Sequence, residues 1–156
     1  MIKINVIVGN KSWKKYIKNP KIYIKNRIKL LNNSSNFFKN KDIYFSLLLS
    51  GSQEIKVINK KFRKKNKITD VLSFPFYERK KIREFFKKKI PFYLGDIIIN
   101  LDKIIYQSNN KKSIKIEFDK LWIHGLAHLL GYRHRFNKDY AKMKKIENSF
   151  LTSLTK

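Results

Sequence analysis

The chain has 156 residues, of which 37 are lysine or arginine and 11 are aspartate or glutamate, so its formal net charge is +26. This length favours one domain, a hydrophobic content of 42% argues against wholesale disorder, and the lack of cysteine excludes disulfides, thiolate metal sites and cysteine nucleophiles. No apolar run approaches the roughly 18 residues of a membrane span or the h-region of a secretory signal, so we expect a soluble, cytoplasmic protein.

The first half of the chain alternates strand patterns with helix patterns. Residues 1–8 alternate apolar and polar side chains and predict a strand that ends at Gly9. A helical pattern then runs from Pro20 to about Phe38, and residues 43–50 form a β-rich apolar run. Ser52 is a good N-cap for the next helix, whose apolar positions are Ile55, Ile58 and Phe62.

The middle of the chain predicts two further strands. A basic loop over residues 64–67 precedes a β-rich segment, Thr69 to Phe76, which Pro75 marks as an edge or exit. Residues 77–89 are charged and are expected to be helical or irregular. Residues 93–100 (YLGDIIIN) predict the fourth strand.

The last third of the chain is predicted to be helical. One helix begins at Leu101, and a longer one runs from about Ser113 to Leu130 and ends at Gly131. A final helix covers residues 137–154. Its apolar stripe is predicted to pack in the core and consists of Tyr140, Met143, Ile146, Phe150 and Leu154. The whole chain, residues 1–156, is therefore predicted to be a single α+β domain with a sheet of about four strands packed with helices.

The strong positive charge has two explanations that the sequence leaves open. A basic protein carries the electrostatic signature of a polyanion partner, most simply RNA. The excess is mostly lysine, however, and the chain is also rich in isoleucine and asparagine. Since these three residues share A/T-rich codons, a biased genome would produce the same composition. The charge alone supports an anionic partner only weakly.

All three histidines of the chain lie in one short segment, WIHGLAHLLGYRH. His124 and His128 are four residues apart on a predicted helix and therefore share one face. Gly131 ends that helix and lets His134 return as a third ligand. The spacing H-x-x-x-H-x-x-G-x-x-H is that of a zinc-binding signature, and three imidazoles leave one coordination position open. We predict one Zn²⁺ per chain, against the alternative of three incidental histidines.

The residue after the first histidine argues against a peptidase. Zinc peptidases of this spacing carry a glutamate there as general base, and this chain has Gly125. Glycine cannot accept a proton. It allows close helix packing or room for a substrate.

The same segment, HGLAHLLGYRH, resembles the signature HGxLHLxGYDH of the YbeY family of bacterial zinc endoribonucleases. Two further segments agree in order: EIKVINKKFRKKNKITDVLSFPF (Glu54 to Phe76) and LGDIIIN (Leu94 to Asn100). Met143 and Glu147 also fall where the family has a methionine and a glutamate. The resemblance covers about residues 45–150.

This resemblance implies a zincin-like metallohydrolase fold and cleavage of single-stranded RNA in small-subunit rRNA maturation and ribosome quality control. It implies that His124, His128 and His134 are the zinc ligands and that Arg63 is the family's functional arginine, which would stabilise charge on a phosphate. The expected partners are rRNA and the small ribosomal subunit, with no membrane and no DNA specificity. Attack by water and attack by the RNA's own 2′-OH both stay open. The alternative function is a ribosome-binding assembly factor with a structural metal and little catalysis.

The chain departs from the family at one position beside the third ligand, where Arg133 replaces an aspartate. Arginine cannot orient a ligand histidine or handle protons as an aspartate does, but it can contact phosphate. Other polar residues carry two interpretations each. Asp70 pairs with Arg63 or closes a turn, Asp96 supports the site or a strand edge, and Glu147 orients a ligand histidine or faces solvent. Ser73 lacks a nucleophile motif and is expected to be structural.

Overall fold

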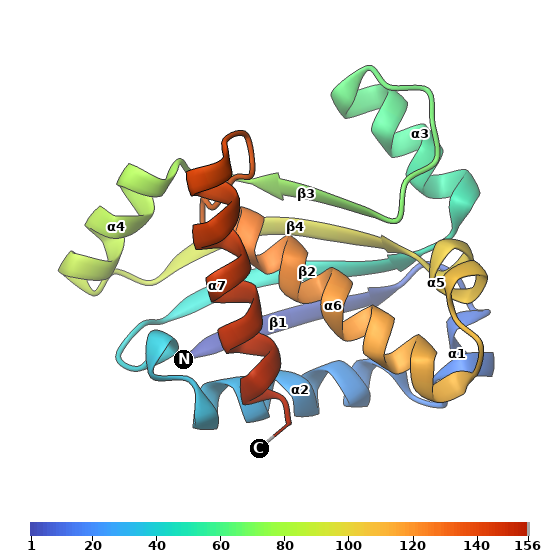
Figure 1. Cartoon of the computed structure of the whole chain (residues 1–156), viewed down its shortest axis with the longest axis horizontal. Coiled ribbons are helices and arrows are strands. Elements are labelled where there is room, and N and C mark those ends of the chain that lie inside the picture. The colour runs from blue at the N-terminus through green and yellow to red at the C-terminus, as the bar shows by residue number, and fades with distance from the viewer. Residues whose placement is uncertain (156) are drawn as a thin grey trace.

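In the computed structural model, which describes residues 1–155, four strands form one mixed sheet in the order β1-β2-β4-β3 (Figure 1). Strands β1, β2 and β4 run parallel, and β3 is an edge strand antiparallel to β4. Their bounds are β1 (Ile2–Val8), β2 (Ile43–Ser50), β3 (Val71–Pro75) and β4 (Phe92–Asn100). The predicted α+β class and all four predicted strands are confirmed.

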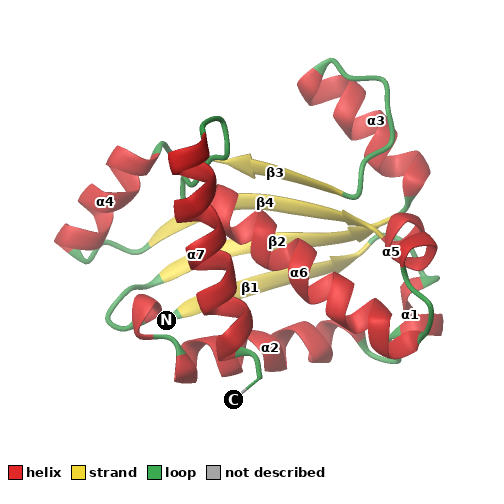
Figure 2. Ribbon diagram, viewed as in Figure 1, coloured by secondary structure: helices red, strands yellow, loops and turns green. Residues whose placement is uncertain are grey.

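Seven α-helices and one short 3-10 helix connect and cover the strands within the described residues (Figure 2). They are α1 (Trp13–Tyr16), α2 (Pro20–Ser34), η1 (Asn36–Phe38), α3 (Ser52–Arg63), α4 (Arg79–Lys88), α5 (Leu101–Gln107), α6 (Lys111–Leu129) and α7 (Asn137–Ser153). None of the helices in residues 1–155 combines the length and apolarity needed to cross a bilayer.

The main core lies between one face of the sheet and the helices α2, α6 and α7 (Figure 1). Alternate residues of β2 point into it, because successive side chains of a strand face opposite sides. Phe118, Trp122 and Phe150 contribute fully or almost fully buried aromatic rings from α6 and α7. A smaller buried cluster of Ile55, Leu72 and Ile98 holds α3 on the opposite face.

A buried polar group ties α2 to α6 inside this arrangement. Asp119 is 5% exposed and accepts hydrogen bonds from Arg27, from the Tyr23 hydroxyl (2.9 Å) and from the Trp122 indole (3.0 Å). A buried carboxylate needs such partners to offset its lost hydration. The network therefore fixes the position of α6, the helix that carries two of the histidines.

Several local predictions differ from the structure. The helix predicted to reach Phe38 ends at Ser34, because Ser35 is extended and its side chain accepts from Phe37 to begin η1. Gly51, not Ser52, is the N-cap of α3. The segment 77–89 contains the regular helix α4, and α1 was not predicted.

Tyr140, predicted to pack in the core, is exposed, and so is Phe62, an apolar position of the helix predicted after Ser52. Phe62 is 62% exposed at the end of α3, and Tyr140 is 56% exposed in the first turn of α7. Each lies close to a helix end, beyond the neighbouring elements that bury the rest of its stripe.

Candidate metal centre

Helix α6 is held close to the sheet at Gly125. A Cβ atom at this position would lie 2.8 Å from Cγ2 of Ile97 in β4 and 3.1 Å from Oγ of Ser73 in β3. The first distance is shorter than real Cβ contacts and the second is tighter than most, so glycine permits the close packing of helix and sheet. Of the two roles predicted for Gly125, the structure supports packing, and a glutamate there would begin inside this contact.

The end of α6 turns the third histidine toward the first two. Gly131 has a φ of +84°, a left-handed conformation that favours glycine. The backbone N–H of Gly131 donates to the His128 carbonyl, and that of Tyr132 donates to the Ala127 carbonyl, which closes the helix. The chain then reverses and brings His134 beside α6.

The three histidines form one cluster. Their nearest ligand atoms all lie within 4.8 Å of one another. Nε2 of His124 and Nε2 of His128 are 3.1 Å apart, and the His134 ring centroid lies 5.1 Å from that of His128. Nitrogens at such separations can share one tetrahedral metal ion. The predicted convergence of these residues is therefore present in the fold.

The other ring nitrogens of two histidines are occupied by acceptors. Nδ1 of His124 lies 2.6 Å from Oε1 of Glu147, and Nδ1 of His128 lies 3.1 Å from the Tyr132 carbonyl oxygen. These contacts place the proton on Nδ1 and leave Nε2 free to bind a metal. Burial, together with the nearby His124, lowers the pKa of His128 to about 4, so its ring is in the neutral, metal-binding form.

Glu147 contacts His124 and is nearly buried, so the alternative of a solvent-facing glutamate is wrong. Its side chain is 10% exposed, and α7 carries it against His124. The spacing of 23 residues between them gives no periodic signal, since only the packing of α7 on α6 joins them. The resemblance to a family motif was the one available hint.

Two cavities flank the cluster along β3. The first, of about 400 Å³, adjoins His124 and is bordered by Asp70, Lys120 and Lys144. The second, of about 240 Å³, adjoins His128 and has several cationic side chains on its walls: Arg79, Lys80 and Arg133. Acidic side chains border both cavities as well, Asp70 and Glu147 the first and Glu78 the second, so only the cavity beside His128 has an excess of cations.

Arg63 is not among the groups that contact the histidines. It is the last residue of α3, Nη2 donates to the Ser73 carbonyl (2.7 Å), and its guanidinium lies 5.5 Å from the centre of the Phe74 ring. The structure therefore places Arg63 at the outer edge of β3. Ser73 itself has a structural role, with its hydroxyl facing Gly125.

Two acidic residues singled out in the sequence do not contact the histidines. Oδ1 of Asp70 accepts from the Val71 N–H (2.8 Å), so this residue closes the turn before β3 and does not pair with Arg63. Asp96 accepts from the Tyr93 hydroxyl (2.7 Å) on the sheet face opposite α6. Of the two interpretations of Asp96, support of the histidine site is wrong, because its side chain bonds Tyr93 on the other face of the sheet.

The sequence and the fold of the chain match known proteins. A family model described as "Endoribonuclease YbeY" matches residues 8–155. A protein of that name from Pelagibacter ubique is 42% identical over 153 residues, covering 95% of this chain and 93% of the relative, and one from Ehrlichia canis is 36% identical over 156 residues, covering 99% and 93%. A solution structure from Thermotoga maritima shares the fold with a TM-score of 0.54 at 21% identity, covering 99% of this chain and 89% of that one.

Proposed function

The chain belongs to the YbeY endoribonuclease family, and from this premise we propose that it is a single-strand-specific, metal-dependent endoribonuclease of small-subunit rRNA maturation and ribosome quality control. The observation that carries the proposal is the cluster of His124, His128 and His134 between two cation-bordered cavities. The proposed partners are rRNA and the small ribosomal subunit, and the proposed location is the cytoplasm.

The donor set fits Zn²⁺, which we propose binds once per chain. Three neutral imidazoles are ligands that zinc favours, and three protein ligands are typical of catalytic sites. When bound, zinc supplies Lewis acidity toward a phosphoryl oxygen and lowers the pKa of water. Glu147 and the Tyr132 carbonyl hold the rings of His124 and His128 in the required orientation.

The RNA backbone would follow the free edge of β3. Asp70 and Val71, at the start of the strand, border the cavity beside His124, and Pro75, at its end, borders the cavity beside His128. Lys120 and Lys144 on one side, and Arg79, Lys80 and Arg133 on the other, would bind successive phosphates. This path presents one phosphodiester to the histidines between them.

Arg63 would act on the same strand from the edge of β3. Its guanidinium uses one N–H for the Ser73 carbonyl, and four further N–H donors belong to the same planar group. A planar donor group bound to the scaffold suits a phosphate oxygen on which negative charge develops. We propose this charge-stabilising role for Arg63.

One observation favours a second candidate, an assembly factor with a structural metal and little catalysis. Arg133 stands where the family has an aspartate, so the chain lacks that acidic group beside His134. A peptidase, by contrast, is disfavoured by the close packing of Gly125 against Ile97.

The test compares the unchanged protein with His128→Ala. Tyr106→Ala is the control, since Tyr106 is an 88% exposed residue of α5. We expect the unchanged protein and the control to hold one zinc per chain and to cut single-stranded rRNA in a chelator-sensitive reaction. His128→Ala should lose both properties while retaining its circular dichroism spectrum. Zinc binding without cleavage would favour the assembly factor, and a 2′,3′-cyclic phosphate on the product would identify attack by the 2′-OH.

A further inference from the structure

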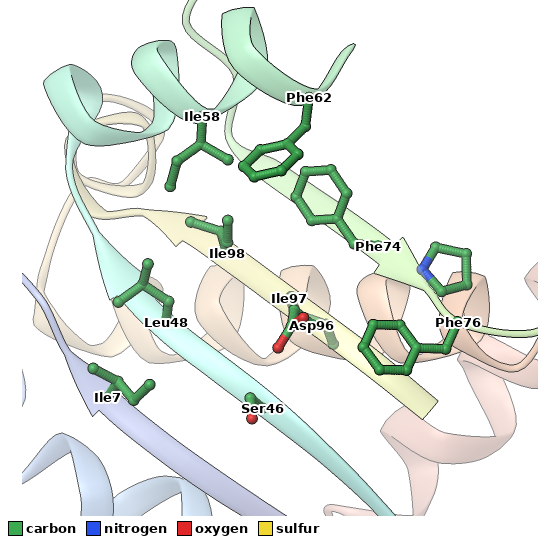
Figure 3. A pocket seen from close by; sticks show the side chains of 11 residues that line it. Ile7, Ser46, Leu48, Ile58, Phe62, Phe74, Phe76, Asp96, Ile97 and Ile98 are labelled. Atoms are coloured by element: carbon green, nitrogen blue, oxygen red, sulfur yellow. The ribbon is translucent and has the colours of Figure 1, made fainter. Parts of the chain in front are cut away.

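The sheet face opposite α6 carries a cavity that the proposed chemistry does not use. It has a volume of about 530 Å³ and lies between the end of α3 and the open parts of the four strands (Figure 3). Its lining is largely apolar, with Ile7 and Leu48 on one side and the rings of Phe62, Phe74 and Phe76 on the other. We call this cavity the aromatic groove.

Two of the three phenylalanines are widely exposed to water. Phe62 is 62% exposed and Phe76 is 60% exposed. Phe62 meets Phe74 edge to face at 5.7 Å, and Phe76 meets Tyr93 in the same way at 5.2 Å. The rings are thus positioned by neighbouring rings while much of their surface stays open. Exposed aromatic rings that border a groove are candidate contacts for a ligand.

The polar atoms of the groove suit a base better than a phosphate. Asp96 is on the lining and accepts from the Tyr93 hydroxyl (2.7 Å), which also lies 2.6 Å from Oγ of Ser46. A carboxylate repels a phosphate, but it accepts hydrogen bonds from the N–H groups on base edges. Aromatic side chains stack on bases of any sequence, since every base has a π-face.

The groove is joined to the candidate metal centre around the end of β3. Pro75 borders both the aromatic groove and the cavity beside His128. Arg63 spans the same edge, because its guanidinium contacts the Phe74 ring on the groove side and the Ser73 carbonyl. A single strand passing the histidines would therefore reach the groove by rounding one strand of the sheet.

We propose that the aromatic groove binds bases of the single-stranded RNA substrate, next to the nucleotides at the metal centre, by stacking on Phe76 and Phe62. This inference rests on the proposed function, since it assigns a second contact to the same substrate. Stacking would give the protein a preference for unpaired RNA, because bases in a duplex are not free to enter the groove.

The first experiment measures binding of a fluorescent single-stranded RNA to the full chain carrying His128→Ala, in which metal-assisted cleavage is prevented. Adding Phe76→Ala should weaken binding about 5- to 100-fold, and Phe76→Trp should retain it. Tyr106→Ala is the matched control, because it removes an exposed aromatic ring from α5, outside the groove. Its affinity should equal that of the His128→Ala parent.

The second experiment separates stacking from charge. An abasic strand with the same number of phosphates should bind equally well to the His128→Ala parent and to the same protein carrying Phe76→Ala. Both native tryptophans are 0% exposed, so bound RNA cannot contact them. Any tryptophan fluorescence that RNA quenches in the Phe76→Trp protein is therefore assigned to the new side chain in the groove. Quenching by the base-containing strand, and none by the abasic strand, is the expected result.

The proposal is overturned if Phe76→Ala and Tyr106→Ala bind RNA equally, or if Phe76→Ala weakens the abasic strand as much as the RNA. The groove would then belong to another occupant, such as an apolar protein segment. Cleavage by the unchanged protein is measured separately. If the groove does not bind bases, the endoribonuclease proposal still stands. If the groove binds bases but the unchanged protein cleaves no RNA, the groove proposal stands and the endoribonuclease proposal fails.

Discussion

Nδ1 of His124 and Oε1 of Glu147 lie 2.6 Å apart, and this contact joins the two long C-terminal helices beside the candidate metal centre. Oε2 of Glu147 also lies 3.6 Å from Nζ of Lys144, a residue that borders the cavity beside His124. A carboxylate that accepts the ligand's N–H fixes the ring and raises its basicity. The orientation of the His124 ring and the placement of a nearby cation thus depend on one side chain, Glu147.

Glu147→Gln should weaken zinc binding about 10- to 100-fold, because the amide keeps the size of the side chain but loses the charge that polarises His124. Competition with a chelator of known affinity measures the change. Glu117→Gln is the control, since Glu117 forms a surface ion pair with Lys120 on α6. Equal zinc affinity in the two variants would show that Glu147 does not support the ligand.

Gly125→Ala should destabilise the fold by about 1 kcal/mol. Replacing a helical glycine with alanine gains about 0.8–1.0 kcal/mol, but overpacking typically costs about 1–3 kcal/mol, and the new Cβ would lie 2.8 Å from Cγ2 of Ile97. Urea unfolding measures the difference. In an Ile97→Ala background the clash is removed, so the same change should be neutral or stabilising. A stabilising effect in the unchanged background would contradict the close contact.

Many elements of the fold can be predicted from local sequence patterns, and the helix end at Gly131 is an example. A left-handed glycine after an apolar helix is a local signal, and it correctly predicted both the end of α6 and the return of His134. The strands were equally readable, because β2 and β4 are apolar runs bounded at Gly51 and Asn100. Such features are set by a few neighbouring residues.

The remaining features depend on contacts between distant segments. Glu147 reaches His124 across the packing of two helices, and Asp96 lies on the far face because of the strand register. Phe62 follows the helical spacing of a core residue, yet no element covers it, and it borders the aromatic groove. None of these relationships has a period that a sequence pattern can express.

Alkaline pH should destabilise the protein through Tyr23. Burial, followed by the charge of Asp119, raises the pKa of Tyr23 well above its ordinary value of 10.0. Below pH 10 the hydroxyl is protonated in both folded and unfolded chains. Above it the unfolded chain loses the proton first, so stability falls as pH rises, by at most about 1.4 kcal/mol per pH unit.

Tyr23→Phe isolates this contribution from the titration of the lysines. The variant is less stable at neutral pH because it lacks the hydrogen bond to Asp119, and its deficit should shrink between pH 10 and 11.5. Urea unfolding at several pH values measures the difference. A deficit that stays constant with pH would mean that Tyr23 ionises equally in both states.

Arg63→Lys should impair RNA cleavage much more than Lys64→Arg or Lys65→Arg. Lysine keeps the charge but loses the planar group that contacts both the Ser73 carbonyl and the Phe74 ring. Loss of one positioned donor typically costs about 10²–10³ in rate. Cleavage rates at saturating RNA make the comparison, with thermal unfolding as the check on folding. Equal losses in all three variants would indicate a diffuse basic surface.

Arg133→Asp should strengthen zinc binding and weaken RNA binding. Within residues 1–155 the His134 ring has no hydrogen-bond partner, whereas Nδ1 of His124 and Nδ1 of His128 each have an acceptor. An adjacent carboxylate supplies an acceptor and attracts the cation. Arg133 also borders the cavity beside His128 together with Arg79 and Lys80. Its loss therefore removes a phosphate contact.

Arg135→Asp is the matched control for the RNA part of this last prediction, because Arg135 is an exposed arginine of the same loop, undergoes the same change of charge and does not border the cavity beside His128. Relative to it, Arg133→Asp should reduce the slope of log affinity against log salt by about 0.7, the value for one phosphate contact on a single strand. Chelator competition should show tighter zinc, and cleavage at saturating RNA and zinc should be at least as fast as in the unchanged protein. If Arg133→Asp instead releases zinc or abolishes cleavage, Arg133 is a working part of the centre and replaces the family's aspartate in function as well as in sequence.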